Sequence, residues 1–484
     1  MTTAVVVGSG PNGLAAAIRL ARAGCQVRVL EAADRIGGGT RTTERIVPGL
    51  LHDDCAAFHP TGAASPFLAT LGLERYGLSW AEPEVQLAHP LDGGRAGALW
   101  RNVERTAAAL GEDGRAWRRI FGRTAEHFDV LAGEVFRPVA HLPRHPVALA
   151  EFGVQALMPA SWTVRRFRTP EARGLFAGAA AHAFGSLSTP LSSPIGLMLG
   201  AAGHAAGWPV AVGGSQAITT AMAALLADLG GKIETGVTVT DLAELDGSDV
   251  VLLSVSPKAA LSILGERLPR RVARAYRRYR YGPAAFKVDY AVEGGVPWAN
   301  EHARVAGTLH LGGSWEEVSA AEAATARGRM PDRPFVLAGQ QYLADPSRSV
   351  GDVHPFYAYA HVPHGFTGDA TGAVTAQIER FAPGFRDRIV GTHVRSAVEM
   401  ERYNPNYVGG DINVGANTVV QVAMRPRVAA DPYATGVPGV FLCSSATPPG
   451  PGVHGMCGYG AAGSALKHVG AGTGHGGVGL IEAS

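Results

Sequence analysis

The chain has 484 residues, of which 46% are hydrophobic and only 17% are charged, so it can bury an extensive core or line an apolar binding surface, and we expect two domains. A formal net charge of +2 gives no reason to expect nucleic acid as a partner. The four cysteines (Cys25, Cys55, Cys443, Cys457) form no CxxC pair, which predicts neither a disulfide framework nor a metal site.

The N-terminus carries no recognisable targeting segment. The first predicted strand begins at residue 4, which leaves no room for a cleavable signal, and no uncharged apolar run of 18 residues reads as a membrane span. We therefore expect a reduced, cytoplasmic protein, and leave open a contact with a membrane surface.

The strongest motif follows at once. An apolar strand at 4–7 enters the turn GSGPNG at 8–13, and small apolar residues at helical spacing then run to Gly24. In this fingerprint Gly8 permits the tight turn, Gly10 lets a pyrophosphate approach the backbone, and Gly13 lets the helix pack close to the sheet. The helix N-terminus offers unpaired N–H groups to phosphates, so the stretch predicts a dinucleotide site.

An acidic residue ends the second strand of this unit. Glu31 follows a strand at 26–30 and lies 18 residues after Gly13, close to the offset of about 20 residues typical of a ribose ligand. Its carboxylate can accept hydrogen bonds from ribose hydroxyls and would repel a 2′-phosphate. FAD or NAD is therefore favoured over NADP.

A second glycine turn, RIGGGTRT at 35–42, comes directly after this unit, and a simple NAD-binding domain does not need it. It resembles the arginine and double-glycine segment of flavoproteins of the amine oxidase and phytoene desaturase superfamily, which lies along the FAD pyrophosphate and ribityl chain. The resemblance implies an α/β fold: a Rossmann-type, glutathione-reductase-like FAD-binding domain with a discontinuous α+β substrate domain.

The resemblance also implies how the chain is divided. The FAD-binding domain would comprise residues 1–75, 209–270 and 433–468, the substrate domain 76–208 and 271–432, and 469–484 would be a flexible, glycine-rich tail. Periodicity predicts helices over 115–135, 170–184 and 217–229, and strands over 250–255 and 285–292. Residues 240–248 form a short polar connection where relatives usually place a β-hairpin.

Two later segments extend the resemblance. The loop at 403–413 is similar to the NPN segment of phytoene-dehydrogenase-like flavoproteins, and the turn at 444–455 is similar to their flavin-side turn, although Ser444 and Ala446 replace glycines and Pro448 replaces a common histidine. A strand, this turn and a helix would direct backbone N–H groups toward the flavin ring. The predicted FAD-binding residues are Gly8, Gly10, Pro11, Asn12, Gly13, Glu31, Ala32, Arg35, Gly38, Gly39, Thr40, Arg41, Val237, Ser445, Gly455, Met456 and Cys457.

Four residues are candidates for catalysis. The chain has only four lysines, and Lys287, with Trp298 eleven residues later, resembles the lysine that holds a water against the flavin in amine oxidases; the alternative is a strand-end lysine that reaches solvent. His454, in the flavin-side turn, can take a substrate proton or serve a structural role. His59 is a substrate-side candidate or a core histidine, and Tyr407 a weaker candidate that can equally serve a turn.

Only one dinucleotide fingerprint is present, so we expect oxygen, a quinone or another diffusible acceptor to reoxidise the flavin. The expected activity is an FAD-dependent desaturase or dehydrogenase that removes two hydrogens from adjacent carbons of a hydrophobic or secondary-metabolite substrate. The alternatives are an amine oxidase, disfavoured because no tryptophan follows Trp315, a redox-neutral flavin isomerase, and a prenyl-lipid carrier that uses no flavin. The oligomeric state stays open.

Overall fold

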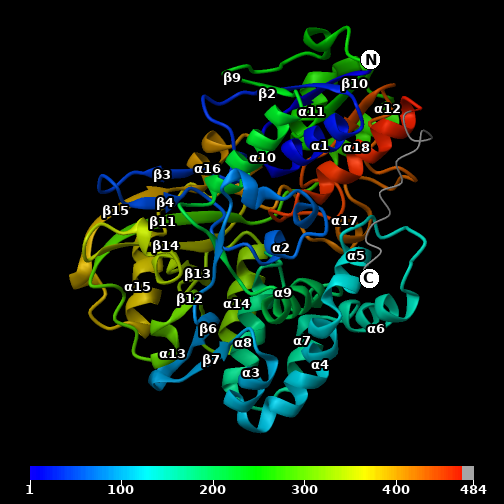
Figure 1. Cartoon of the computed structure of the whole chain (residues 1–484). Coiled ribbons are helices and arrows are strands. Elements are labelled where there is room, and N and C mark those ends of the chain that lie inside the picture. Colours follow the sequence, from blue (N-terminus) through cyan, green and yellow to red (C-terminus); the bar gives the residue numbers. More distant parts are fainter. Residues whose placement is uncertain (471–484) are drawn as a thin grey trace.

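The structure is a computed structural model that describes residues 1–470; residues 471–484, most of the predicted tail, lie outside that range. Two β-sheets with helices on both organise the chain (Figure 1). The first is parallel, in the spatial order β16 (Val440–Leu442), β10 (Val250–Leu253), β1 (Thr3–Val7), β2 (Gln26–Glu31) and β9 (Lys232–Thr235). β1 occupies the centre, as a Rossmann-type sheet requires.

The side chains of β1 point alternately to the two faces of this sheet, and helices cover both faces. Ala4 and Val6 pack in one cluster with α1 (Pro11–Arg22), α10 (Gln216–Asp228) and α18 (Met456–His468). Val5 and Val7 pack in another with α11 (Pro257–Leu264) and α12 (Arg270–Arg277). The strand is therefore apolar throughout because helices bury both of its faces.

The second sheet is mixed and has seven strands: β15 (Ile389–Arg395), β11 (Ala284–Glu293), β14 (Val353–Val362), β13 (Val336–Gly339), β12 (Ala306–Leu311), β6 (Val85–Pro90) and β7 (Ala96–Leu99). β12 and β6 pair in parallel, and the other pairs are antiparallel. α13 (Glu301–Arg304) and α15 (Thr371–Phe381) cover one face. α8 (Pro170–Ala181) and α14 (Trp315–Ala326) lie on the other side. The predicted α/β fold, with a Rossmann-type sheet and a second, α+β part, is confirmed, and the structure shows that the sheet of the second part is mixed.

The remaining helices form a layer beside the second sheet, at the lower right of Figure 1: α3 (Val103–Ala109), α4 (Gly114–Glu126), α5 (Phe128–Val135), α6 (Pro146–Ala156), α7 (Ala160–Thr163) and α9 (Ser193–Ala205). Short elements complete the fold: β3 (Thr42–Glu44), β4 (Leu51–Asp53), α2 (Pro60–Ala63), β5 (Trp80–Ala81), β8 (Val210–Ala211), α16 (Ala397–Tyr403) and α17 (Val419–Met424). Within residues 1–470, none of the helices combines the length and hydropathy that a membrane span requires.

Two predicted helices differ from the observed ones. The helix expected over 115–135 breaks at His127, whose dihedral angles are not helical; α4 packs on α9, whereas α5 turns toward α6. The helix expected over 170–184 ends at Ala181 because Phe184 adopts a positive φ of 50°. This early end places His182 at a turn.

Buried ion pairs hold the β3–β4 hairpin against the loop before β14. Asp53, at the end of β4, accepts hydrogen bonds from Thr42 Oγ1 (2.8 Å) and the Ser215 backbone N–H (2.7 Å), and it pairs with Arg348. Arg348 has no exposed side-chain area and also binds Asp345 at 3.1 Å. These contacts fix the β3–β4 hairpin to the loop that precedes β14.

Replacing Arg348 tests this connection. Arg348→Met leaves Asp53 and Asp345 buried without their shared cation, so we expect the free energy of unfolding to fall by about 3–5 kcal/mol. The matched control Arg123→Met removes an exposed pair with Glu151 and should cost less than about 1 kcal/mol. Urea denaturation measures both, and equal losses in the two variants would contradict a special role for Arg348.

Candidate cofactor and substrate site

One cavity of about 960 Å³ extends from the carboxyl ends of the parallel strands to the second sheet. Most of the predicted site residues line it: Gly8, Gly10, Pro11, Asn12, Glu31, Ala32, Gly38, Gly39, Thr40, Arg41, His59, Val237, Tyr407, Ser445 and His454. Six do not: Gly13, Arg35, Lys287, Gly455, Met456 and Cys457. The ribose, pyrophosphate and flavin-side predictions thus meet in one place.

The first glycine turn has the shape that a pyrophosphate site needs. A Cβ on Gly13 would lie 1.9 Å from the Gly8 carbonyl oxygen, so Gly13 serves close helix packing and not the cavity. A Cβ on Gly10 would meet only the Gly38 Cα, at 3.9 Å, so Gly10 keeps open space in front of the helix. α1 begins there with no side-chain cap and no acidic residue in its first turn. Its positive end is therefore available to an anion.

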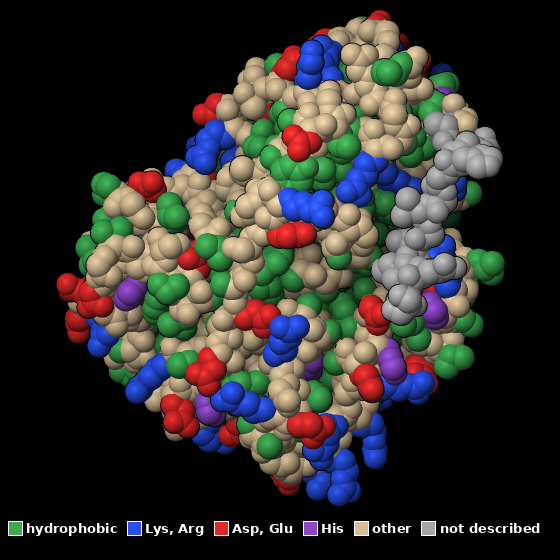
Figure 2. Space-filling view, viewed as in Figure 1, with side chains coloured by type: hydrophobic (Ala, Val, Ile, Leu, Met, Phe, Trp, Pro, Cys, Tyr) green, Lys and Arg blue, Asp and Glu red, His purple; other side chains and the backbone are tan. Residues whose placement is uncertain are grey.

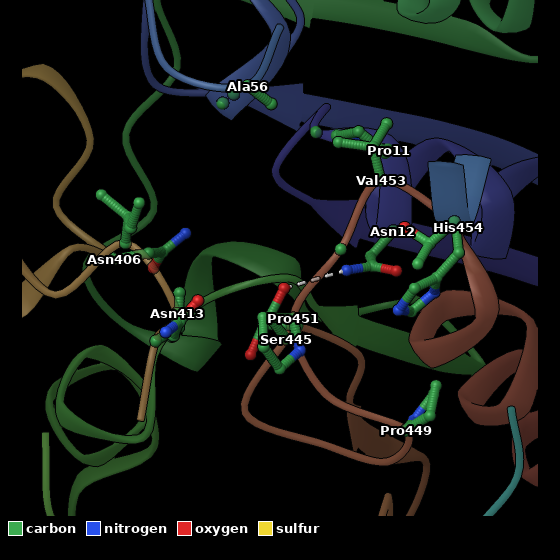
Figure 3. A pocket seen from close by; sticks show the side chains of 18 of the residues that line it. Pro11, Asn12, Ala56, Asn406, Asn413, Ser445, Pro449, Pro451, Val453 and His454 are labelled. Carbon is green, nitrogen blue, oxygen red and sulfur yellow. Dashed lines mark hydrogen bonds between the residues drawn. The ribbon is translucent and has the colours of Figure 1, made fainter. Parts of the chain in front are cut away.

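Asn12 joins this turn to the flavin-side turn. Its Nδ2 donates to Ser445 Oγ at 3.3 Å, the dashed contact in Figure 3, while its Oδ1 is buried without a partner in the described chain. In the same view Asn406 and Asn413 lie on the opposite side of the pocket. A buried acceptor with no partner is costly unless a ligand or water donates to it.

Glu31 is held firmly at the end of β2. Its Oε2 accepts from the backbone N–H (2.9 Å) and hydroxyl (2.6 Å) of Ser9, and its Oε1 accepts from the Ala33 N–H (2.9 Å) and Arg41 (3.3 Å). The two backbone donors are fixed, whereas the Ser9 hydroxyl can rotate. The carboxylate can therefore keep its orientation while it accepts a hydrogen bond from a ribose hydroxyl.

Two tyrosines support the second glycine turn. Tyr403 Oη donates to the Gly38 carbonyl at 2.6 Å, and a Cβ on Gly39 would lie 2.2 Å from Tyr407 Oη. Burial raises the pKa of Tyr407 well above its usual value, so its phenol stays protonated at neutral pH. Tyr407 thus packs against the turn. Arg35 donates to the Thr42 carbonyl at 3.2 Å and holds the turn from outside the cavity.

The flavin-side turn is organised by His454. Its Nδ1 accepts a hydrogen bond from the Met456 N–H at 3.0 Å, which satisfies a donor in the first turn of α18, and burial lowers its pKa to about 4. A Cβ on Gly455 would lie 2.9 Å from the Ala15 Cβ, and the Cys457 thiol donates to backbone carbonyls. Residues 455–457 therefore hold α18 against α1 behind the cavity wall. The proton-transfer role of His454 stays a prediction.

His59 presents an acceptor to the cavity. Its Nε2 lies 2.8 Å from Ser215 Oγ, and that hydroxyl donates to the Ala56 carbonyl at 2.7 Å. Because the single hydroxyl proton is used there, Nε2 carries the imidazole proton and Nδ1 is bare. Nδ1 is buried with no partner in the described chain, and burial lowers the pKa of His59 to about 4.

Lys287 lies in the middle of β11 and not at a strand end. Its amine pairs with Asp289 and lies 5.4 Å from the centroid of the Tyr357 ring, and it is absent from the cavity wall. Burial works against the Asp289 carboxylate, but the charge and hydrogen bond of Lys287 together with His393 and His52 outweigh it and hold the pKa of Asp289 below its usual range. Trp298 donates to Gln340 at 2.9 Å inside the core. The water-holding role of Lys287 stays a prediction, and its amine faces the back of an aromatic ring.

The substrate end contains residues that the sequence analysis did not select. Tyr357 and Tyr359 lie on one face of β14, with their rings 6.3 Å apart and nearly parallel, and both line the cavity with Trp208. His182 and Thr308 line it as well. The alternation of rings and alanines over 357–361 is the sequence signal that could have marked this face.

Comparison with known proteins agrees with this geometry. A family model described as an NAD(P)-binding Rossmann-like domain matches residues 6–71. An uncharacterized protein of Mycobacterium tuberculosis is 26% identical over 76% of this chain and 75% of its own length. Hydroxyneurosporene desaturase of Cereibacter sphaeroides is 30% identical over 50% of this chain and 51% of the desaturase. The chain is an oxidoreductase with an FAD/NAD(P)-binding Rossmann domain.

A solved structure extends the likeness to the whole chain. Putrescine oxidase, solved with putrescine bound, superposes with a TM-score of 0.56 at 18% identity, over 97% of this chain and 99% of the oxidase. At that identity the likeness shows a shared fold: a parallel nucleotide-binding sheet joined to a mixed sheet.

Gly10 provides a test of the cofactor site. Gly10→Val should fold normally because its side chain enters open space, and it should reduce the amount of bound FAD about tenfold by filling the pyrophosphate position. The control Gly122→Val also enters open space, in α4 and away from the cavity. Flavin absorbance per mole of purified protein measures the effect, and an undiminished value in Gly10→Val would refute this placement.

Proposed function

We propose that the protein is an FAD-dependent desaturase or dehydrogenase that removes a hydride and a proton from adjacent carbons of a hydrophobic or secondary-metabolite substrate. The observation that carries this proposal is the continuity of the cavity. Its nucleotide end leads directly into a chamber whose wall includes Phe152, Leu199, Trp208, Leu337 and Tyr357. A chamber of this kind favours an apolar substrate and excludes water from the reacting carbons.

The residues present fit FAD. The first glycine turn and the start of α1 would hold the pyrophosphate. Glu31 would bind a ribose hydroxyl, and Val237 would contact the adenine end. The turns at 38–41 and 444–455 would hold the ribityl chain and the flavin ring. The bound flavin supplies the hydride acceptor. The distant homology to a desaturase supports C–H oxidation as its use here.

The chain's own side chains would orient the substrate and accept its proton. His59 Nδ1 is a bare acceptor in the cavity wall, so it can take the proton that leaves the adjacent carbon. Tyr357 and Tyr359 offer flat faces against which an extended, unsaturated chain can lie.

An amine oxidase is the second candidate because the fold of putrescine oxidase is shared. The cavity wall includes two carboxylates, Glu31 and Glu134. Glu134 already accepts from the Arg144 and His145 N–H groups at 2.9 Å each and lies 2.7 Å from His141. A cationic amine would therefore find no uncommitted carboxylate on the wall, which favours the desaturase.

Anaerobic titration of the purified protein tests the proposal. We expect a flavin spectrum that bleaches with hydroxyneurosporene or another polyene in detergent, that does not bleach with putrescine, and that returns when oxygen or a quinone is added. Bleaching by putrescine would favour the amine oxidase. Conversion of one polyene isomer into another without net bleaching would favour the isomerase. A colourless protein that cannot be reconstituted with FAD would overturn the proposal in favour of a carrier.

We also propose that the cavity mouth touches a membrane surface. Val139 and Leu157 line the cavity and are each 63% exposed, and Leu142, Val147 and Val154 nearby are also exposed. Figure 2 shows hydrophobic side chains near basic and histidine side chains on the right of the view, where Figure 1 places α6. Such a surface lets a hydrophobic substrate enter without crossing water.

Vesicle flotation tests this contact. The protein should float with phosphatidylglycerol vesicles, and a variant with Leu142→Ser, Val147→Ser and Val154→Ser should stay in the dense fraction because it buries less apolar area. A control with Val390→Ser changes another exposed valine, which lies on β15 in the second sheet. If the triple variant floats as well as the wild type, these three side chains do not bind the membrane and the proposed contact is wrong.

A further inference from the structure

A pair of histidines lies at the substrate end of the cavity, with His310 buried and His182 only partly buried. His182, at the turn after α8, and His310, on β12, have their Nε2 atoms 2.9 Å apart, so one ring donates a proton and the other accepts it. Burial lowers the pKa of His182 to about 3 and that of His310 well below its usual value, so both rings are neutral at pH 7. Each ring therefore carries one proton.

The surroundings of His310 decide which ring donates. Its Nδ1 packs against α8, where a Cβ on Gly178 would lie only 2.4 Å away, and it has no partner in the described chain. A buried N–H without an acceptor there would destabilise the fold more than a buried nitrogen lone pair without a donor, since buried N–H groups without a partner are rarer in proteins than unpaired acceptors. The proton of His310 is therefore on Nε2, and His310 donates to His182.

His89 shows the same arrangement nearby. Its Nε2 lies 2.7 Å from the Gly313 carbonyl oxygen, which can only accept, so the proton is on Nε2. Its Nδ1 is bare, buried and without a partner in the described chain, as at His310. The ring packs against Gly174, where a Cβ would lie 2.7 Å from His89 Cδ2.

It follows that His182 carries its own proton on Nδ1. The ring is part of the cavity wall and only partly buried, and no residue in 1–470 accepts from this N–H. A second unsatisfied group is close by in the fold: Thr308, two residues before His310 on the same face of β12, lines the cavity with a buried hydroxyl that has no partner among those residues. His182 and Thr308 thus each bring a polar group without a partner in residues 1–470 to the same part of the cavity wall.

We infer that His182, with Thr308, binds an oxygen atom of the substrate, so that the substrate is an oxygen-bearing hydrophobic molecule (a ketone, aldehyde or alcohol) and not a pure hydrocarbon. The inference rests on the proposed function only in taking this cavity as the substrate chamber. A carbonyl oxygen accepts two hydrogen bonds and can satisfy both groups at once. A hydrocarbon would leave both groups unpaired and dry, which binding sites built for polar groups discriminate against strongly.

Binding without turnover tests the inference. Calorimetric titration of the purified protein with 2-undecanone and 1-undecene should give a dissociation constant about tenfold lower for the ketone. A tenfold difference corresponds to the net free energy of roughly one hydrogen bond. His182→Phe and Thr308→Val should bring the two constants closer together, because the ketone loses a hydrogen-bond donor and the alkene no longer leaves that group unpaired. Thr325→Val is the matched control, because Thr325 has a buried, unpartnered hydroxyl that does not line the cavity.

The outcomes are distinct from those of the flavin titration, since no redox step is involved. A ketone preference that falls in either cavity variant but not in Thr325→Val supports the inference, and Thr308→Val keeps the test valid if His182→Phe does not fold. Equal affinity for the two probes in the wild type, no binding of the ketone up to its solubility limit, or a preference retained in both cavity variants overturns it, whatever the flavin titration shows.

Discussion

The cavity depends on two buried carboxylates at the end of β4. Asp53 pairs with Arg348 and Asp54 with Arg395, and all four side chains are almost fully withdrawn from water. Charges in such a place must stay paired, because an uncompensated buried ion costs several kcal/mol. β4 leads directly into residues 55–60, where the Ala56 N–H donates to Gly39 at 3.0 Å. The ion pairs therefore set how the glycine turns face the second sheet.

These charges are kept out of the chamber. Behind Tyr357, Lys287 and Asp289 neutralise each other, and Arg348 is enclosed by two aspartates, so the aromatic rings form the surface that a ligand meets. The histidines of the wall are neutral because burial disfavours their charged forms. Buried ion pairs thus hold the structure behind the aromatic rings, while the tyrosines and the neutral histidines bring uncharged polar groups to the wall.

The sequence revealed the cofactor end better than the substrate end. Residues 4–41 contain strand, turn, helix, acid and second turn in one run. Spacing indicated the first glycine turn and Glu31, and the resemblance to flavoproteins indicated the second glycine turn. Lys287 shows the limit of such reasoning: its position resembled a cavity lysine, and the ring of Tyr357 that covers it comes from the pairing of β11 with β14, which no local pattern encodes. His182 could not be predicted as a site residue from the sequence, because its place depends on the turn after α8 and on its contact with His310 of β12, 128 positions later.

The nucleotide end and the substrate end of the cavity are built from different kinds of structure, and this bears on which substrate the protein binds. A pyrophosphate site is made of backbone turns, so the glycines that would shape it can be recognised from their spacing in the sequence. The chamber is instead assembled from α5, α6, α9, β12, β13, β14 and α17, each of which can change its side chains without disturbing the glycine turns. Fold likeness to an amine oxidase therefore carries little weight for the substrate. The parallel tyrosines, the committed carboxylates and the neutral histidine pair of this chain carry more, because they are what the reacting molecule would touch.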